Sequence, residues 1–558
     1  MKTAQRTLFA ATLLTIFSTS VMAQDVTIIY TNDLHAHVDS YKVPYVADGK
    51  RDIGGFANIS TLVKQEKAKN KATFYFDAGD YFTGPYISSL TKGEAIIDIM
   101  NTMPFDAVSI GNHEFDHGWD NALRQLSKAN FPVLLGNVYH KESEKPFWNK
   151  PYTILEKDGI KIGIVGLHGV FAFNDTVSEL SLQGLDNDNN NRFDKSSAPL
   201  KNQGIEARDE VKYLQHYIDE LRDKVDLTVA LVHEGVPARQ SSIGNTDVRR
   251  ALDKDIQTAS KVKGLDILIT GHAHVGTPEP IKVGNTLILS TDSGGIDIGK
   301  LILDVNPTAR THKVKSFELK TVYADEWIPD PTTQKVINGW NKKLADLVRQ
   351  PVGESSIALT RAYGESSQLG NLFTDAMLVA APTAQIALIN SGSLRADINA
   401  GTITFGDITS TFPFKNELTE MDLSGKDLRN LLEHGASLTN GILQMSKGAE
   451  MRYTLQKPVG QRIVSFKING EEIVDTNIYH VATTTFLALG GDGFLAFKEG
   501  KNVQVRAGNN MSNVVIDYFK KGHKITPAQV NETVTYTHLT LPTICSAYIR
   551  VAAVSLTK

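Results

Sequence analysis

The 558-residue chain contains only one cysteine, Cys545. An internal disulfide is therefore impossible, and the folded state must be stabilised by the burial of apolar side chains. The hydrophobic content of 41% supplies enough apolar surface for this in a chain of this length. Length and composition together predict two globular domains.

A large net charge is also missing, because 58 Lys and Arg residues nearly balance 62 Asp and Glu residues and leave −4 at pH 7. The chain as a whole therefore has no attraction for a nucleic-acid polymer or an anionic membrane. Beyond residue 23, no apolar run is long enough to cross a bilayer. We expect a monomer with small-molecule partners that are bound locally, and neither a nucleic-acid polymer nor a membrane anchor.

Residues 1–23 have the three parts of a secretory signal peptide. Lys2 and Arg6 give a positive start, an apolar stretch at 8–17 follows, and small residues precede the expected cut after Ala23. Gln24, and not a cysteine, stands directly after that cut, which argues against a lipid anchor there. The pattern predicts export of the mature protein, which we expect to be periplasmic or secreted.

Five short segments rich in Asp, His and Asn are spread over the first half of the chain. They are TNDLHAH at 31–37, DAGD at 77–80, GNHEFD at 111–116, LVHEG at 231–235 and GHAH at 271–274. Four of them follow apolar runs rich in β-branched or aromatic residues, which predicts that they lie at the ends of buried strands. Carboxylate, amide and imidazole groups that converge in this way suit a pair of divalent cations. The pattern indicates a two-metal hydrolase.

The region after these segments indicates where the first domain ends. Two apolar runs, at 283–290 and 300–305, are typical of closing strands. A Pro-Asp-Pro start, apolar residues at helical spacing and a stop at Pro351 then predict a linker helix within 326–351. We therefore expect a signal peptide at 1–23, a first domain at 24–325 and a second domain at 352–535, with helices at 369–380 and 425–434.

Two further segments have unusual sequences. Residues 185–197 (LDNDNNNRFDKSS) place polar side chains at calcium-loop offsets, but the Gly and the final Glu of an EF-hand loop are absent, which favours a solvated loop. Residues 536–558 form an atypical tail whose YTHLTLPT sequence resembles the translation of a transposon-end adapter used in DNA sequencing. A sequencing artefact and a genuine tail are both open interpretations.

In this order, the five polar segments resemble the motifs of the calcineurin-like metallophosphoesterases. Three further motifs, INSGSLR at 389–395, TFPFKNEL at 411–418 and TTTFLALGGDGF at 483–494, narrow the resemblance to the bacterial periplasmic 5′-nucleotidase/UDP-sugar hydrolase family. The resemblance spans nearly the whole mature chain. It implies an α/β fold with an N-terminal four-layer α/β/β/α metallophosphoesterase sandwich, a linker helix and a C-terminal α/β nucleotide-specificity domain.

The resemblance also implies two divalent metal ions, which could be Zn, Mn, Co or Mg. Asp80 would bridge both ions, since a carboxylate offers two oxygens. The remaining ligands would be Asp33, His35 and His274 for one ion, and Asn112, His233 and His272 for the other. A lone His or Asp at a strand end is usually a cap or a turn residue, but seven candidates within five ordered motifs favour metal binding.

His113 follows a candidate ligand and, by the resemblance, would stabilise the transferring phosphoryl group or protonate the leaving oxygen. Asp116 would orient this imidazole and keep it cationic. His274 stands where some relatives have Gln, which should preserve coordination but could change the metal preference. We interpret Asp77 as a structural turn residue. His37, His117 and His168 lack motif support and are interpreted as loop or supporting residues.

The second-half motifs imply a nucleotide site. By the resemblance, Phe414 and Phe486 would stack on the two faces of the base, and Asp492 would accept hydrogen bonds from the ribose hydroxyls. Asn390 would contact the base or the sugar, and Arg395 the phosphate, with Arg361 as a second phosphate-binding candidate. The SGSLR segment departs from the consecutive glycines of many relatives, and the spacing around Arg361 is longer than usual.

These features predict an exported phosphohydrolase. It would release phosphate from nucleoside 5′-monophosphates for nucleotide scavenging. Nucleoside di- and triphosphates, UDP-sugars and NAD are candidate additional substrates. A 2′,3′-cyclic-nucleotide phosphodiesterase or a thiosulfate-ester hydrolase could use the same scaffold. A catalytically silent nucleotide-binding protein is the alternative from another class, and the retention of every candidate ligand together with His113 and Asp116 argues against it.

Overall fold

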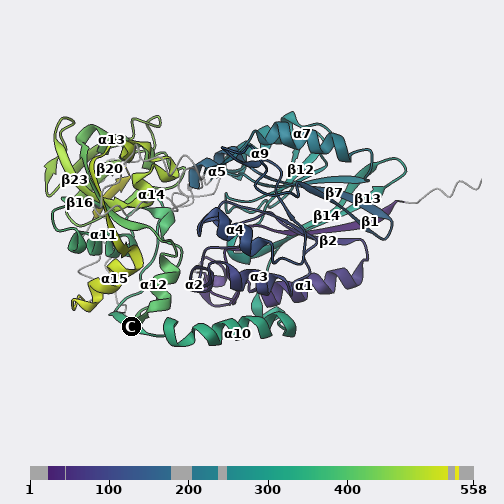
Figure 1. Cartoon of the computed structure of the whole chain (residues 1–558), viewed down its shortest axis with the longest axis horizontal. Helices are drawn as coiled ribbons and strands as arrows, with labels where there is room; N and C mark the ends of the chain where they lie inside the picture. The colour runs from purple at the N-terminus through teal and green to yellow at the C-terminus, as the bar shows by residue number, and fades with distance from the viewer. Residues whose placement is uncertain are drawn as a thin grey trace, which may run out of the picture.

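The computed structural model describes residues 23–43, 45–176, 204–236, 248–523, 525 and 534–538. Two α/β domains lie side by side, and the long helix α10 (Pro331–Val348) runs along the edge of the first domain toward the second (Figure 1). The expected signal peptide up to residue 22, the calcium-like insert at 185–197 and the tail beyond residue 538 lie outside the described residues.

The first domain contains two six-stranded sheets. In the first sheet β1, β2, β3 and β4 are parallel, and β13 and β14 extend it by antiparallel pairing. The order is β14 (Thr311–Thr321), β13 (Asp297–Asn306), β1 (Gln24–Thr31), β2 (Thr73–Asp77), β3 (Ala107–Ser109) and β4 (Val133–Leu134).

The second sheet has four parallel strands between two antiparallel edges. Its order is β11 (Ile281–Val283), β12 (Thr286–Leu289), β10 (Ile267–Thr270), β9 (Leu227–His233), β7 (Ile160–His168) and β6 (Tyr152–Lys157). All seven residues of β9 are buried, and the strand reads LTVALVH without polar alternation, as expected for a parallel strand covered on both faces.

The two sheets pack face to face and share one apolar core, in which Ile28 and Phe74 of the first sheet meet Ile164 and Val229 of the second. Helices cover the outer faces. They are α1 (Phe56–Lys69) and α3 (Glu94–Met100) on the first sheet, and α7 (Glu210–Leu221) and α9 (Asp253–Lys261) on the second (Figure 1). The expected four-layer α/β/β/α sandwich is confirmed.

Helix α10 lies within the segment where a linker helix was expected. Asp330 caps its first turn by accepting a hydrogen bond from Thr333 N at 3.0 Å, and Pro331 occupies the position where a missing N–H costs nothing. Ile337 is buried in the core of the first domain, and Trp340 Nε1 donates to Asp98 at 3.2 Å. The helix is therefore anchored to the first domain along its length.

The second domain is built on a five-stranded mixed sheet. The strand order is β19 (Leu443–Met445), β16 (Ile386–Asn390), β23 (Ile478–Thr484), β18 (Glu417–Ser424) and β24 (Lys501–Asn510). Helices α11 (Gln368–Ala380) and α15 (Met511–Lys520) share one apolar cluster with the sheet, and α13 (Gly425–Gly435) shares another. The expected helices at 369–380 and 425–434 correspond to α11 and α13.

A smaller four-stranded sheet has the order β22 (Glu471–Glu472), β21 (Ile463–Ile468), β20 (Ala449–Tyr453) and β25 (Val534–His538). Residues 536–538, which begin the tail that we considered atypical, pair with β20 in parallel register. Short connecting elements matter for the site: α2 (Tyr86–Thr91), α5 (Val170–Thr176), β15 (Pro351–Ser355), α12 (Phe405–Thr411), α14 (Thr485–Ala488) and the 3₁₀ turn η8 (Gly491–Gly493).

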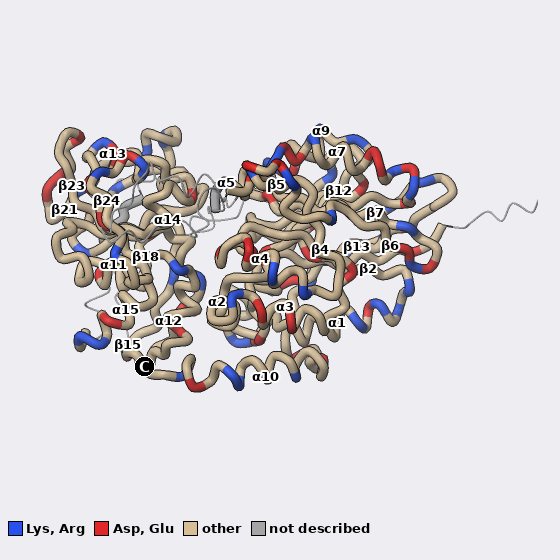
Figure 2. The backbone as a smooth tube through the Cα atoms, viewed as in Figure 1, with Lys and Arg blue, Asp and Glu red and all other residues tan. Residues whose placement is uncertain are grey.

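Charged residues of both signs are interspersed along the two domains (Figure 2). This distribution agrees with the small net charge of the sequence. Among the described residues, no helix combines the length and the apolar composition that a membrane span requires.

Candidate metal centre

The candidate metal ligands lie where parallel strands of both sheets end. Asp33 and His35 follow β1, Asp80 follows β2, and Asn112 follows β3. In the second sheet His233 is the last residue of β9, and His272 and His274 follow β10. Because the carboxyl ends of parallel strands point to the same edge of a sheet, these loops meet at one edge of the sandwich.

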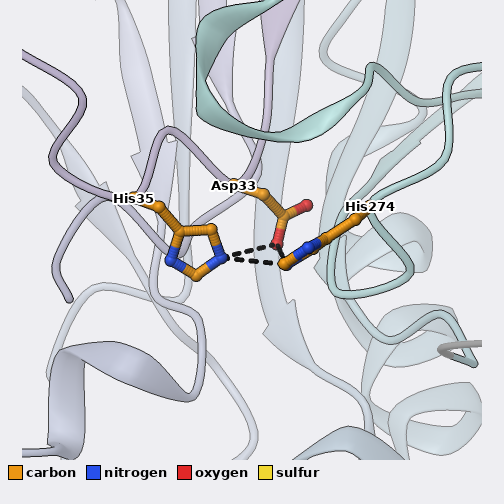
Figure 3. Close-up of side chains that lie close together, drawn as sticks. All are labelled: Asp33, His35 and His274. Atoms are coloured by element: carbon orange, nitrogen blue, oxygen red, sulfur yellow. Dashed lines mark hydrogen bonds and ion pairs between the residues drawn. The ribbon is translucent and has the colours of Figure 1, made fainter. Parts of the chain in front are cut away.

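Asp33, His35 and His274 form the first group of candidate ligands. His35 Nε2 lies 3.8 Å from Asp33 Oδ1, and His274 Nε2 lies 3.4 Å from the same oxygen. The two imidazole Nε2 atoms are 2.9 Å apart. Figure 3 shows the three side chains pointing toward one another, so that one cation could contact all three.

Asp80, His233 and His272 form the second group. Asp80 Oδ2 lies 3.0 Å from His233 Nε2, and Asn112 Oδ1 lies 3.0 Å from His272 Nδ1. Asp80 Oδ2 is also 3.9 Å from His35 Nε2 of the first group. Asp80 therefore lies between the two groups, where a bridging carboxylate is expected.

Several atoms of these groups are buried without a hydrogen-bond partner in the described part of the chain. They include Asp80 Oδ2, His233 Nε2 and His272 Nε2. Burying a polar atom without a partner costs about 1–3 kcal/mol, and more when the atom is charged. Asp80 Oδ2 and His233 Nε2 lie 3.0 Å apart, and carboxylate with imidazole is a donor set that divalent zinc, manganese or cobalt accepts. The residues fit two divalent cations.

The backbone around the centre is strained. Asp33, His35, Asp80, His272 and His274 all have positive φ angles, of 51°, 43°, 62°, 72° and 55°. Such a conformation is uncommon for residues other than glycine and costs roughly 1–3 kcal/mol each when it lies in a sparsely populated region. Strain of this kind persists where the surroundings determine the geometry, and it gathers at functional sites.

Close approach of two loops also shapes the centre. Gly79 has a φ of 92°, and a Cβ at this position would lie 2.5 Å from Gly111 N. A side chain at Gly79 would therefore separate the DAGD and GNHEFD segments. Asp77 accepts hydrogen bonds from Gly79 N at 2.9 Å and from the Thr31 hydroxyl at 2.6 Å, which is the structural role that we expected for it.

Outer hydrogen bonds orient the imidazoles. His35 Nδ1 contacts Thr83 O at 2.8 Å, and His233 Nδ1 contacts Ala78 O at 2.8 Å. A carbonyl oxygen can only accept, so each Nδ1 carries the proton and each Nε2 is left to face the centre. Thr83 was not singled out from the sequence, because this contact uses its backbone and leaves no trace in residue type.

Glu114 is a second residue that the sequence reasoning missed. It is fully buried, and its carboxylate accepts hydrogen bonds from Asp80 N at 3.0 Å, Phe82 N at 2.9 Å and Gly111 N at 2.7 Å. Burial, followed by the Asp80 carboxylate, raises the pKa of Glu114 to about 7. The side chain ties the two loops together, and its position inside the GNHEFD segment was the available signal.

The charges of the centre are coupled. Burial alone would raise the pKa of Asp80, but the imidazoles of His233, His113 and His35 lower that pKa well below its ordinary value. Burial lowers the pKa of His35 and of His272 well below 6.5, which favours the neutral rings that can donate a lone pair to a metal. The Asp80 carboxylate and these two rings thus favour the states that metal binding requires. His233 differs, because Asp80 outweighs the effect of burial and raises the pKa of this imidazole to about 10, so a metal ion would have to displace its proton.

His113 lies beside the two groups and contacts both domains. Its Nδ1 lies 2.8 Å from Asp116 Oδ2, and its Nε2 lies 2.7 Å from Arg395 Nη2 of the second domain. Burial opposes protonation of His113, but Asp116 and Asp80 outweigh it and raise the pKa. The guanidinium can only donate, so in this arrangement Nε2 accepts and the ring proton lies on Nδ1. An anion placed between Arg395 and His113 would free Nε2 to carry a proton.

In the second domain, Asn390 and Asp492 lie together. Asn390 Nδ2 donates to Asp492 Oδ2 at 2.7 Å, and Asp492 has a left-handed φ of 52°. The Asp492 carbonyl oxygen accepts from His434 Nε2 at 2.7 Å and from Asn440 Nδ2 at 3.1 Å. These two supporting residues were not predicted, because they lie outside the motifs and reach the GGDG turn only in the folded domain.

The candidate stacking residues are in different surroundings. The Phe414 ring lies 5.8 Å from the His113 ring and 5.4 Å from the Arg395 guanidinium carbon. Phe486 packs partly against the core beneath α13, with its ring against Gly491. No contact between these two rings is found in the described part of the chain.

Arg361 lies behind Arg395 and does not reach the metal groups. Its guanidinium donates to the carbonyl oxygen of Arg395 and, through Nε at 3.1 Å, to Asp397. The residue therefore supports the segment that carries Arg395 in this arrangement of the two domains.

The second domain docks on the edge of the first domain that holds the metal groups. Helix α2 lies against α12 (Figure 1), where Tyr86 N donates to Ser410 Oγ and Ser89 Oγ donates to Pro413 O, both at 3.0 Å. On another side, α5 contacts η8. The candidate ligands, His113 and the nucleotide motifs are thereby brought to one interface.

Comparison with protein families divides the chain in the same way. Residues 26–276 match the calcineurin-like phosphoesterase family, and residues 347–499 match the family described as the 5′-nucleotidase C-terminal domain. The first match includes all five polar segments, and the second lies within the C-terminal half of the chain and includes the three nucleotide motifs.

Similar proteins have nucleotide hydrolase names. The chain is 28% identical over 546 residues to the trifunctional nucleotide phosphoesterase protein YfkN of Bacillus subtilis; the match covers 90% of this chain and 34% of that protein, so the chain spans about a third of its length. It is 28% identical over 555 residues to an apyrase of Tabanus yao, covering 89% of this chain and 91% of that protein. The crystal structure of a 5′-nucleotidase precursor from Thermus thermophilus superposes with a TM-score of 0.76 at 24% identity, covering 93% of this chain and all of that one.

Proposed function

Because the chain belongs to the calcineurin-like metallophosphoesterases that carry a 5′-nucleotidase C-terminal domain, we propose that it releases phosphate from nucleoside 5′-monophosphates. One observation supports this proposal above the others. His113 lies at the metal groups and at the same time contacts Arg395 and Phe414 of the nucleotide motifs. A phosphate at the metal centre and a nucleoside in the second domain can therefore belong to one substrate.

The residues at the metal centre have separate roles in the proposed reaction. Asp80 would contribute to both cation sites; Asp33, His35 and His274 would hold one cation, and Asn112, His233 and His272 would hold the other. When bound, two divalent cations polarise phosphoryl oxygens and activate water. His113 stabilises the transferring phosphoryl group or protonates the leaving oxygen, and Asp116 holds its ring by the 2.8 Å contact to Nδ1.

The second domain provides specificity. Phe414 and Phe486 stack on the base, and Asp492, held by Asn390, accepts hydrogen bonds from the ribose hydroxyls. Arg395 binds the phosphate through its planar guanidinium. Arg361 is the second phosphate-binding candidate, but its bonds to Asp397 and to the Arg395 carbonyl favour a supporting role.

The cellular role that we propose is nucleotide scavenging outside the cytoplasm. The signal-peptide pattern of residues 1–23 supports export to the periplasm or the medium. The similarity to an apyrase and to a trifunctional nucleotide phosphoesterase supports nucleoside di- and triphosphates as further substrates. We also propose UDP-sugars and NAD as substrates, because both contain a nucleoside and a pyrophosphate.

The test is phosphate release from a panel of substrates by the purified, metal-supplemented protein. The panel contains AMP, ATP, UDP-glucose, NAD, 2′,3′-cyclic AMP and p-nitrophenyl phosphate. We expect AMP to have the highest kcat/KM, and a Phe486→Ala variant to lose the preference for AMP over p-nitrophenyl phosphate. A higher kcat/KM for the cyclic nucleotide than for AMP would favour the phosphodiesterase alternative, and inactivity on every member would favour a silent binding protein.

A further inference from the structure

The segment 82–89 contacts both the metal centre and the second domain, although it lies outside every motif of the sequence. On the metal side, the Thr83 carbonyl oxygen lies 2.8 Å from His35 Nδ1. The Thr83 hydroxyl reaches His113 O at 3.5 Å. The Thr83 backbone thus helps to orient one candidate ligand, and the Thr83 hydroxyl contacts the backbone of His113, which we place at the phosphate.

The conformation of the segment is fixed locally. Thr83 has a φ of 48°, which is an outlier for a β-branched residue. The fully buried Ser88 stabilises this conformation, because the Ser88 hydroxyl accepts a hydrogen bond from Thr83 N at 3.0 Å. Gly84 packs so tightly against the His35 carbonyl that a side chain would not fit. The turn into α2 therefore has little freedom to move independently of His35.

The opposite side of the segment bonds to the second domain. Ser89 Oγ donates to Pro413 O at 3.0 Å, and Pro413 directly precedes Phe414. The same loop bonds to Arg395, whose N donates to Thr411 O at 2.8 Å. A displacement of this loop would consequently move both the ring and the guanidinium that contact His113.

We propose that Ser89 is a positioning residue for the nucleotide clamp, by which we mean Phe414, Phe486 and Arg395 of the second domain. Its hydroxyl holds the 411–416 loop against the first domain by a hydrogen bond. This bond fixes the positions of Phe414 and Arg395 relative to His113. Through Ser88 and Thr83 the same segment holds His35, so a single rigid turn sets the distance between clamp and metal centre. The specificity role rests on the proposed function, because it assumes that the clamp binds a nucleoside.

The experiment compares Ser89→Ala with Ser89→Thr, which restores the hydroxyl, and with a matched control on the same helix. The control is Thr91→Val, because the Thr91 hydroxyl bonds to Ile87 O and Ala95 N, which both belong to the first domain. Losing one hydrogen bond across the interface should lower kcat/KM for AMP by roughly threefold to tenfold in Ser89→Ala. The kcat/KM for p-nitrophenyl phosphate should fall less, because that ester shares the phosphate that Arg395 binds but has no nucleoside for Phe414 to contact. Ser89→Thr and Thr91→Val should behave like the unaltered protein.

A second measurement does not depend on the substrate. Amide hydrogen exchange in peptides that cover 405–416 should be faster in metal-loaded Ser89→Ala than in the unaltered protein without any nucleotide. Equal losses for AMP and p-nitrophenyl phosphate, an unchanged kcat/KM for AMP, or unchanged exchange at 405–416 would each overturn the positioning role. If the unaltered protein cleaved p-nitrophenyl phosphate but did not hydrolyse AMP, the proposed function would be refuted instead. The hydrogen-exchange measurement would then show by itself whether Ser89 holds the 411–416 loop in place.

Discussion

At the scale of single residues, the proposed bridging carboxylate Asp80 and the proposed amide ligand Asn112 test the metal centre most directly. Asp80 lies between both groups, and Asn112 contacts His272 in the second. We predict that Asp80→Ala or Asn112→Ala abolishes turnover and lowers the metal content, because each removes a ligand and leaves buried imidazoles unsatisfied. Elemental analysis of the purified variants beside AMP hydrolysis checks this. Full metal occupancy in Asp80→Ala would contradict the bridging role.

His113 should behave differently from the ligands. It is bonded to Asp116 and Arg395 and belongs to neither candidate group. We predict that His113→Ala keeps its metals and loses about 10²–10⁴ in kcat, the usual contribution of one acid–base or charge-stabilising group. The loss should affect AMP and p-nitrophenyl phosphate alike, since both contain the phosphoryl group. Metal loss or a near-normal kcat in this variant would show that its role is misassigned.

Phe486 should affect only substrates with a base. Stacking of one base on an aromatic ring contributes about 1–3 kcal/mol and is roughly equal in the ground and transition states. We therefore predict that Phe486→Ala raises KM for AMP by about tenfold to a hundredfold with a smaller change in kcat. Steady-state kinetics on AMP and on p-nitrophenyl phosphate separate the two effects. An equal loss on both would identify Phe486 as a packing residue of the cluster beneath α13.

The candidate ligands were predictable from the sequence, whereas the residues that hold them were not. Asp33, His35 and Asp80 sit in short motifs directly after apolar runs, so both their residue type and their place at a strand end are local information. Glu114 and Thr83 act through bonds to or from the backbone of other loops. Such bonds depend on left-handed turns and on close loop approach, which hydrophobic periodicity does not encode.

At the scale of secondary-structure elements, burial explains which strands could be predicted. The apolar runs before the polar segments form β1, β2, β9 and β10, because each is covered on both faces and needs no alternation. The order of the strands was not predictable. Strand β13 joins the first sheet beside β1 although about half of the chain separates them, and this pairing is decided by tertiary packing.

His480 on β23 gives the second domain a pH-dependent stability. Its Nδ1 lies 2.7 Å from Asp422 and its Nε2 lies 3.1 Å from Glu420, and these carboxylates also bond to Asn502 and Arg506. Burial lowers the pKa of His480, but the hydrogen bonds to Asp422 and Glu420 outweigh burial and raise it. The protonated ring, which can donate from both nitrogens, is thus favoured in the folded state.

A raised folded-state pKa means that this stabilisation is fully present below the ordinary value of 6.5 and is lost as pH rises through the folded-state pKa. We predict that, at pH values below about 6.5, the His480→Gln variant has a lower Tm than the unaltered protein. This difference in Tm should shrink as the pH rises toward about 9. Thermal unfolding across this range checks it, with His216→Gln on the exposed face of α7 as the control. A Tm difference that does not change with pH would contradict the assignment.

At the scale of the whole molecule, the two domains enclose the site between them. Arg395 reaches across to His113, and α2 is bonded to α12 through Tyr86 and Ser410. These contacts lie where a nucleotide would have to pass between the second domain and the metal centre. We therefore infer that turnover requires repeated opening of the interface.

A disulfide across the interface tests this motion. Tyr86 N lies 3.0 Å from Ser410 Oγ, so we choose these two positions as the candidate pair for cysteines that link the domains. We predict that Tyr86→Cys with Ser410→Cys, in a chain that also carries Cys545→Ser, loses turnover on oxidation and regains it on reduction. The two single variants serve as controls for each substitution. Full activity of the oxidised double variant would show that opening is not required.

The most direct test of the account is the metal dependence of AMP hydrolysis. The protein is stripped with a chelator, manganese is returned in measured amounts, and phosphate release from AMP is followed at each step. The two candidate groups of Asp33, His35 and His274 and of Asp80, His233 and His272 predict no release from the stripped protein and full activity at two bound ions per chain. Phosphate release that persists without metal, or that is complete with one ion bound, would contradict a dinuclear metallophosphoesterase.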